Sequence, residues 1–178
     1  MEEDMKSTFE KIYKNESDTI FRFCLLRVSD REQALDITQE TFLRFWKKMQ
    51  EEKEILNSKA FLFMIARHLI IDWYRKKKSF SLDKIMRGND IEKEGSYDVL
   101  DENTTKVNLD IGADGRYLIE KINNLAPSYR ESVYLRFIED LSPPEIGVIL
   151  GITANAASVR INRGLIELRK ISGYDKES

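Results

Sequence analysis

Apolar residues recur at helical spacing through two long blocks of the sequence, and this pattern limits the chain to an all-α fold. Spacings of three and four residues place apolar side chains on one face of an α-helix, where they pack against other helices. No convincing alternation of β-branched residues, as expected for strands, competes with this pattern. The two blocks predict two small helical domains, at residues 1–78 and 116–178.

A third segment, residues 79–115, separates the two blocks and differs from them in composition. Acidic residues outnumber basic ones there, and the helical periodicity is lost. Segments with many charges and few apolar residues seldom bury enough surface to fold alone. We therefore expect a flexible acidic linker between the two domains.

Composition argues against several classes of function. The formal net charge of −2 excludes a globally basic nucleic-acid binder but leaves room for a local basic patch. Cys24 and His68 are the only cysteine and histidine, so zinc ribbons and cysteine–histidine catalytic pairs lack their ligands or bases. No glycine-rich phosphate loop occurs. Enzymatic chemistry would have to rest on carboxylates alone, and no pair of them stands out. We therefore expect no catalytic residue, no metal site and no cofactor, and we do not expect an enzyme.

The chain is expected to reside in the cytoplasm without inserting into a membrane. A single cysteine cannot form an internal disulfide, which is typical of a reducing compartment. The longest apolar run, residues 60–66, is much shorter than the roughly 18 residues that span a bilayer. The N-terminus lacks the pattern of a secretory signal.

Polar residues predict the helix boundaries of the first block. Residues 15–18 are expected to interrupt the first helix, and Ser29 with Glu32 forms an S-x-x-E capping box that should start the next one. One face of that next helix is apolar, and another carries Asp36, Gln39, Glu40, Leu43 and Lys47. A polar face of this kind is usually only solvated.

The segment AFLFMIARHLIIDWYRKKK, residues 60–78, joins an apolar and aromatic half to a basic end. Together with Lys59, its cations are opposed only by Asp72, which predicts a local basic patch that can follow phosphates. These cations are Arg67, Arg75, Lys76, Lys77 and Lys78. A lone histidine such as His68 is more often a satisfied residue than a functional one, so its role stays open on the residues alone.

Residues 142–170 carry the pattern of a helix–turn–helix. Ser142 and Glu145 form a second capping box, and the prolines between them fit the first helical turn. Gly151 supplies the turn, and Thr153 can cap a second helix over residues 154–170. The outward side of that helix, which suits a major groove, carries Asn155, Ser158, Val159, Arg160, Asn162 and Arg163. An ordinary helical hairpin with solvated arginines is the alternative.

Three segments, in this order, resemble the extracytoplasmic-function (ECF) sigma factors of bacterial RNA polymerase. ALDITQETFLRFW, residues 34–46, is similar to the segment with which that family binds core polymerase. Residues 60–78 are similar to its promoter-melting and −10-reading helix. LAPSYRESVYLRFIEDLSPPEIGVILGI, residues 125–152, is similar to the start of its −35-reading domain. His68 stands where the family commonly has asparagine, and Ser158 where a basic residue is usual.

The resemblance implies a sigma factor that directs core polymerase to specific promoters and assists the melting of DNA. Its implied partners are bacterial core RNA polymerase, promoter DNA and an anti-sigma factor. The implied core-polymerase contacts are Asp36, Gln39, Glu40 and Leu43. The implied contacts to single-stranded −10 DNA are Arg67, His68, Ile71, Arg75, Lys76, Lys77 and Lys78. The implied −35 contacts are Asn155, Ser158, Val159, Arg160, Asn162 and Arg163.

Two other classes of function stay open beside this one. A DNA-binding regulator would use the helix–turn–helix without joining polymerase, and it would leave residues 34–46 with no purpose beyond packing. A carboxylate-dependent metal enzyme acting on nucleic acid would need clusters of ligands that the sequence does not indicate.

Overall fold

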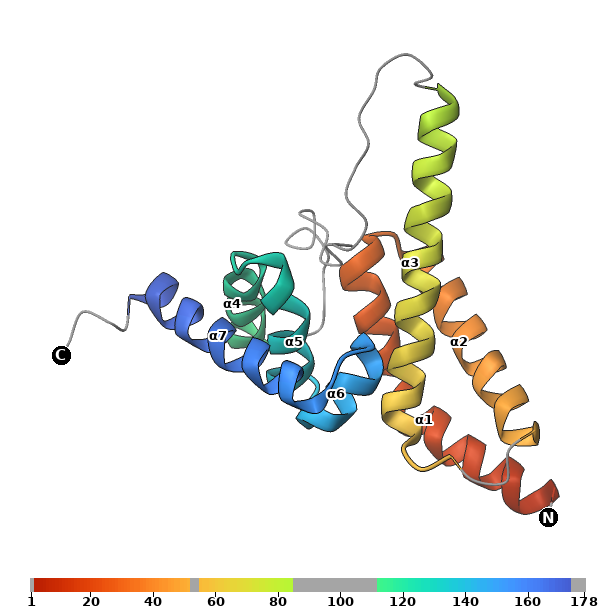
Figure 1. The fold of residues 1–178 in the computed structure, drawn as a ribbon. Helices are drawn as coiled ribbons and strands as arrows, with labels where there is room; N and C mark the ends of the chain where they lie inside the picture. Colours follow the sequence, from red (N-terminus) through yellow and green to blue (C-terminus); the bar gives the residue numbers. More distant parts are fainter. Residues whose placement is uncertain (1, 52–54, 85–111, 174–178) are drawn as a thin grey trace.

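The computed structural model describes residues 2–51, 55–84 and 112–173, and it arranges them as seven α-helices with no strand among them (Figure 1). The all-α prediction is confirmed for this part of the chain. Three helices form an N-terminal set and four form a C-terminal set, and the two sets pack against each other. None of these helices is long and apolar enough to cross a membrane.

The N-terminal set consists of α1 (Glu2–Val28), α2 (Arg31–Glu51) and α3 (Ser58–Lys84). Each of these helices contacts the other two, and aromatic side chains fill much of the space between them. Phe23 and Phe63, both fully buried, meet edge to face with 4.9 Å between ring centroids. Cys24 lies in the same core, where burial raises the pKa of its thiol to about 12. The predicted apolar face of α2 is confirmed, since its buried residues include Ala34, Ile37, Thr41, Phe42 and Phe45.

The predicted interruption of the first helix is wrong, because α1 continues through residues 15–18. Before this stretch, the ring of Tyr13 contacts that of Phe42 on α2, with 4.8 Å between centroids. After it, Ile20 is fully buried. Both ends of the polar stretch are therefore held against the bundle, and tertiary packing overrides its weak helix propensity.

The predicted capping box at Ser29 is also wrong, because the helix cap lies one residue later. Ser29 has a φ of 52°, and its backbone N–H donates to the carbonyl of Leu25 at 2.9 Å, so it closes α1. Asp30 caps α2 instead, since its Oδ1 accepts a hydrogen bond from the Gln33 backbone N–H at 3.0 Å. The left-handed conformation of Ser29 ends α1 at this tight turn, and the N-cap of α2 therefore lies at the next residue.

The C-terminal set consists of α4 (Ala113–Asn123), α5 (Pro127–Phe137), α6 (Pro143–Leu150) and α7 (Ala154–Ser172). Its core contains Ile122, Leu135 and Ile146, all fully or almost fully buried. Gly164 of α7 lies directly against α5. A Cβ atom at this position would be 2.4 Å from Val133 Cγ2, so only glycine allows the two helices to approach this closely.

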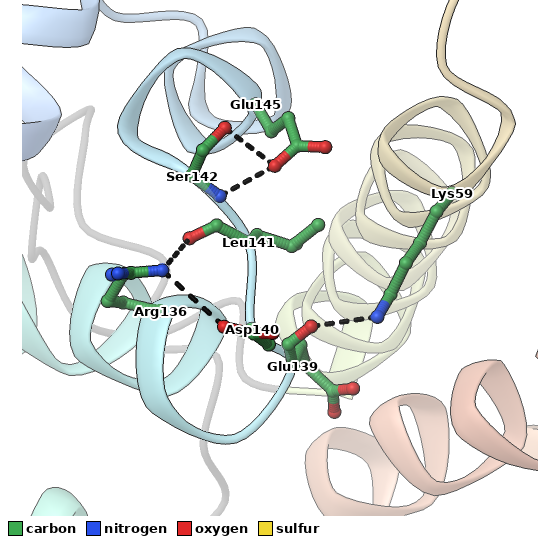
Figure 2. A network of polar contacts seen from close by, with 7 residues as sticks. All are labelled: Lys59, Arg136, Glu139, Asp140, Leu141, Ser142 and Glu145. Carbon is green, nitrogen blue, oxygen red and sulfur yellow. Dashed lines mark hydrogen bonds and ion pairs between the residues drawn. The ribbon is translucent and has the colours of Figure 1, made fainter.

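Helices α6 and α7 form the predicted helix–turn–helix, which is confirmed. The Glu145 carboxylate accepts hydrogen bonds from the backbone N–H and the hydroxyl of Ser142, each at 2.6 Å (Figure 2). Gly151 adopts the left-handed conformation at the end of α6, with φ 67°. Thr153 Oγ1 then accepts from the backbone N–H of Ala156 at 3.1 Å and caps α7.

The segment between the two sets is helical at both of its ends. Helix α3 continues to Lys84 and α4 begins at Ala113, so the predicted loss of helical structure over residues 79–115 is wrong there. Arginine and lysine are good helix formers, so the stretch Arg75–Lys78 supports continuation of α3 beyond residue 78. Most of the predicted acidic linker, residues 85–111, lies outside the described residues.

Candidate nucleic-acid and protein interfaces

One exposed face of α2 carries the residues predicted to bind core polymerase, namely Asp36, Gln39, Glu40 and Leu43. The first two are exposed, and 48% of the surface of Leu43 is exposed to solvent. Glu40 is half-buried and pairs with Arg44, with 2.7 Å between Oε1 and Nε. Leu35, also 48% exposed, lies four residues before Gln39 and so extends this face by one turn. The spacing of Leu35 is a signal that the sequence analysis overlooked.

The residues predicted on the first half of α3 have different surroundings. His68 is exposed. Arg67 is tied to the C-terminal set, because its Nε donates to Glu131 Oε1 of α5 at 2.9 Å, with the two side chains 19% and 13% exposed. Ile71 is only 9% exposed. Little of its surface is therefore open to a ligand in this arrangement.

The basic end of α3 projects past the other helices of the N-terminal set (Figure 1). Its four consecutive exposed cations are Arg75, Lys76, Lys77 and Lys78. The Lys77 ammonium lies 4.9 Å from the centroid of the Trp73 ring, and Arg75 Nη1 is 3.9 Å from Asp72 Oδ1. Because successive residues point in different directions around a helix, these cations present positive charge on several sides.

The predicted reading face of α7 is largely open to solvent. The exposed members are Asn155, Val159, Asn162 and Arg163, and the half-buried ones are Ser158 and Arg160. Ser158 Oγ donates to the backbone carbonyl of Ala154 at 3.0 Å. Ala157 and Ile161 point inward, as predicted, and are buried. The arrangement separates a packing side from a polar side that carries two arginines.

The two helical sets also share polar contacts that no sequence pattern indicated. Lys59 Nζ of α3 donates to the backbone carbonyl of Glu139 at 2.8 Å (Figure 2). The side-chain amide of Asn57, next to α3, donates to the Glu145 carboxylate that also binds Ser142. These partners are 80 and 88 residues apart in sequence, so no local periodicity could reveal them.

A buried arginine completes this contact between the sets. Arg27 of α1 is 0% exposed, and its guanidinium carbon lies 3.5 Å from the Phe23 ring centroid and 4.6 Å from that of Tyr134 on α5. Arg27 Nη1 donates to the carbonyl of Phe23 at 3.1 Å. Within the described part of the chain, Nε and Nη2 have no hydrogen-bond acceptor.

Two ionisable groups of the C-terminal set, Tyr134 and Glu139, have pKa values that are raised by their own burial. The Tyr134 hydroxyl donates to Glu139 Oε1 at 2.7 Å. Burial raises the pKa of the Glu139 carboxyl above its ordinary value, although the Tyr134 hydrogen bond and the positive charges of Arg27, Arg22 and Lys59 oppose this shift. Burial also raises the pKa of the Tyr134 hydroxyl. The described residues contain no group of three His, Cys, Asp or Glu side chains arranged to hold a metal ion.

Comparison with known protein families defines the class of protein to which these surfaces belong. Residues 12–80, which span most of the N-terminal set, match the family model for sigma-70 region 2. Residues 115–168, which contain the helix–turn–helix, match the model for sigma-70 region 4. The chain is thus built from two sigma-70 regions.

Similar proteins narrow this class further. The ECF RNA polymerase sigma factor SigW of Bacillus subtilis (strain 168) is 32% identical over 177 residues, which cover 95% of this chain and 89% of that protein. SigX of the same organism, also an ECF RNA polymerase sigma factor, is 26% identical and covers 93% of this chain and 84% of that protein. The protein belongs to the family of ECF RNA polymerase sigma factors.

Solved structures agree with this family at the level of the fold. The sigma factor RpoE from Bartonella quintana, in complex with the anti-sigma factor NepR, matches with a TM-score of 0.66 at 20% identity, over 95% of this chain and 99% of that one. CnrH in complex with the cytosolic domain of CnrY matches with a TM-score of 0.58 at 18% identity, over 97% and 91%. Both comparisons show a shared fold.

Proposed function

We propose that this sigma factor binds core RNA polymerase through the exposed face of α2, at Asp36, Gln39, Glu40 and Leu43, with Leu35 as a further contact. The observation that supports this proposal is a helix face whose polar and apolar side chains are both open to solvent. Exposed leucines beside a carboxylate and an amide suit a protein interface that combines an apolar contact with a polar rim.

Two further surfaces bind promoter DNA in this proposal. The cations of α3, from Arg75 to Lys78, follow the phosphates of the unpaired strand, while Arg67 and the exposed His68 contact the −10 element. Ile71 is left out because it is buried. On the duplex, the polar side of α7 enters the major groove at the −35 element, with Asn155, Ser158, Val159, Arg160, Asn162 and Arg163.

The domain division follows from the same assignment. Residues 1–78 act on the polymerase and the −10 element, residues 116–178 act on the −35 element, and residues 79–115 connect them. The chain has no catalytic activity of its own in this scheme, since the polymerase performs the chemistry. It acts in the cytoplasm, where polymerase and DNA reside. We include an anti-sigma factor among its partners, because its structural relative RpoE was solved with one.

A pull-down of purified bacterial core polymerase, followed by transcription on genomic fragments, tests the α2 assignment. We expect Asp36→Lys to weaken core binding by roughly 10- to 100-fold, because a repulsive contact replaces an attractive one in the interface. Transcription above the level of core alone should fall in parallel. Glu10→Lys on α1 is the matched control, since it makes the same charge change at an exposed site outside the proposed surface.

Equal core binding by wild type and Asp36→Lys would refute the assignment of α2. A wild-type protein that binds DNA but forms no stoichiometric complex with core polymerase would favour the rival interpretation, in which the helix–turn–helix belongs to a DNA-binding regulator.

A further inference from the structure

We propose that His68 makes the binding of unpaired promoter DNA by α3 depend on pH, because protonation of its ring adds a positive charge at the −10 contact. The proposal rests on the function proposed above for α3, and it goes beyond that function by coupling a proton to the binding step. The surroundings of His68, its place on α3 and the chemistry of imidazole support the proposal.

The ring of His68 is open to a ligand. The residue is exposed, and within the part of the chain that the structure describes its ring has no hydrogen bond and no ion pair. Arg67, the preceding residue, is instead bonded to Glu131 of α5 at 2.9 Å. Both ring nitrogens of His68 are therefore available to a base edge or a phosphate oxygen.

The charged groups near this part of α3 are engaged with partners other than His68. Asp72 and Arg75 follow His68 by four and seven residues on the same side of the helix, with 3.9 Å between Asp72 Oδ1 and Arg75 Nη1. An imidazolium at His68 would thus present its charge to a ligand. Charged groups on the helices packed against α3 are bonded elsewhere: Glu131 to Arg67, Glu40 to Arg44, Glu145 to Ser142, and Arg27 to the carbonyl of Phe23.

His68 precedes the run of positive charge at the end of α3. The exposed cations from Arg75 to Lys78 begin seven residues after it, which corresponds to about 10 Å along a helix. A single strand that follows this side of α3 meets His68 and then Arg75. Protonation of His68 therefore lengthens the positive surface by about two turns and adds one charge to it.

Imidazole changes its charge in the range where cells work. Histidine ordinarily does so between about pH 5 and 8, and its protonated ring donates two hydrogen bonds where the neutral ring donates one and accepts one. Because a polyanion binds the charged form more tightly, affinity rises as pH falls. His68 is the only histidine of the chain, so no other imidazole of this protein contributes.

Anisotropy of a fluorescent promoter duplex with an unpaired −10 region, bound by holoenzyme between about pH 5.5 and 8, tests the proposal. We expect the wild type to gain roughly fivefold in affinity toward acidic pH relative to His68→Asn. One added charge on a single strand contributes about 0.7 to the logarithmic salt dependence, which gives this factor in about 0.1 M salt. His68→Lys stays charged, so it should bind over the whole range as the wild type does at acidic pH. The pH dependence of core polymerase is common to all three proteins and cancels in the comparison.

The double variant His68→Asn, Asn124→His is the control for histidine as such, because Asn124 is exposed at the end of α4, outside the proposed DNA surfaces. It should follow the profile of His68→Asn. Parallel profiles for wild type and His68→Asn would overturn the proposal, and so would a double variant that regains the pH dependence of wild type. Failure of the proposed function looks different: Arg75→Ala and His68→Lys would then leave the affinity unchanged at every pH. If this inference alone failed, Arg75→Ala would still weaken binding.

Discussion

The two arginines on the polar side of α7 differ in solvent exposure, and this difference affects how each would bind DNA. Arg163 is exposed on the polar side of the helix, and Arg160 is half-buried. An exposed arginine can release a counterion when it binds a phosphate, which makes binding depend on salt. Arg163 is therefore the better single site at which to separate electrostatic contacts from base reading.

We expect Arg163→Ala to weaken binding to duplex DNA from a promoter that the holoenzyme transcribes. The logarithmic dependence of affinity on salt concentration should become shallower by about one unit, because one phosphate contact is lost. Fluorescence anisotropy over a series of salt concentrations measures this slope. Arg169→Ala, which removes an exposed arginine from the last turn of the same helix, should leave the slope unchanged. Equal slopes for wild type and Arg163→Ala would contradict the phosphate contact.

The side of a helix on which a residue lies was easier to predict from sequence than the residues that surround it in the fold. The inward positions of Ala157 and Ile161 followed from helical spacing, because a local period is enough to define a face. The burial of Ile71 and the pairing of Arg67 with Glu131 could not be predicted, because both depend on segments that approach only in the folded chain. Local patterns carry no information about such partners.

At the scale of elements, the approach of α5 to α7 depends on a single glycine. We expect Gly164→Ala to lower the free energy of unfolding by about 2 kcal/mol, because the added methyl group meets Val133 Cγ2 at 2.4 Å. Overpacking of this kind costs about 1–3 kcal/mol, and the β-branched Val133 yields little, so the loss exceeds the gain in helix propensity. Urea denaturation followed by circular dichroism measures the change.

Gly112→Ala is the steric control for this substitution, because a Cβ atom at Gly112 would meet nothing within 4 Å, and the only expected cost is that of alanine as the N-cap of α4. We expect it to lower the midpoint of unfolding less than Gly164→Ala does. If Gly164→Ala were as stable as Gly112→Ala, the close packing of α5 on α7 would not be a determinant of stability.

The ends of elements show why one capping box was predicted correctly and the other was not. Ser142 begins α6 after a loop, so the local sequence alone decides where the cap lies. Ser29 lies between the end of α1 and the start of α2. It adopts the left-handed conformation that closes α1, so Asp30 caps α2 in its place. A sequence motif is thus reliable where no neighbouring element competes for the same residue.

For the whole molecule, the raised pKa of Glu139 makes the stability of the fold depend on pH. The folded chain holds the proton of this carboxyl to higher pH than the unfolded chain, so it binds more protons between the two pKa values. The free energy of unfolding should therefore fall as pH rises from the ordinary pKa of 4.5 through the raised value. Below this interval the carboxyl is neutral in both states and its contribution is constant.

Thermal denaturation of wild type and Glu139→Gln at a series of pH values tests this link. We expect the wild type to lose stability relative to Glu139→Gln as the pH rises through the interval. Hydrogen bonds from Ser142 and Asn57 lower the pKa of Glu145 in spite of its partial burial, and this acts in the opposite direction, but it is common to both proteins and cancels in the difference. Parallel curves would show that Glu139 does not carry the effect.

The way in which the two domains pack against each other could not be predicted from the sequence. The all-α class followed from periodicity, and the helix–turn–helix from its caps and glycine turn. The contact between the sets depends on Arg27 with Tyr134 and on Lys59 with Glu139, and the members of each pair lie in different sigma-70 regions. The sequence pattern that predicts each region is local to that region, so it carries no information about contacts with the other.

The burial of Cys24 makes the native chain a ready background for site-directed labelling. Its thiol is fully enclosed in the N-terminal core, and its pKa of about 12 leaves almost no thiolate at neutral pH. Maleimide dyes would therefore react with cysteines introduced at exposed positions and pass over the natural one. Distances between fluorophores on the two domains can be followed, molecule by molecule, without first removing a residue from the core.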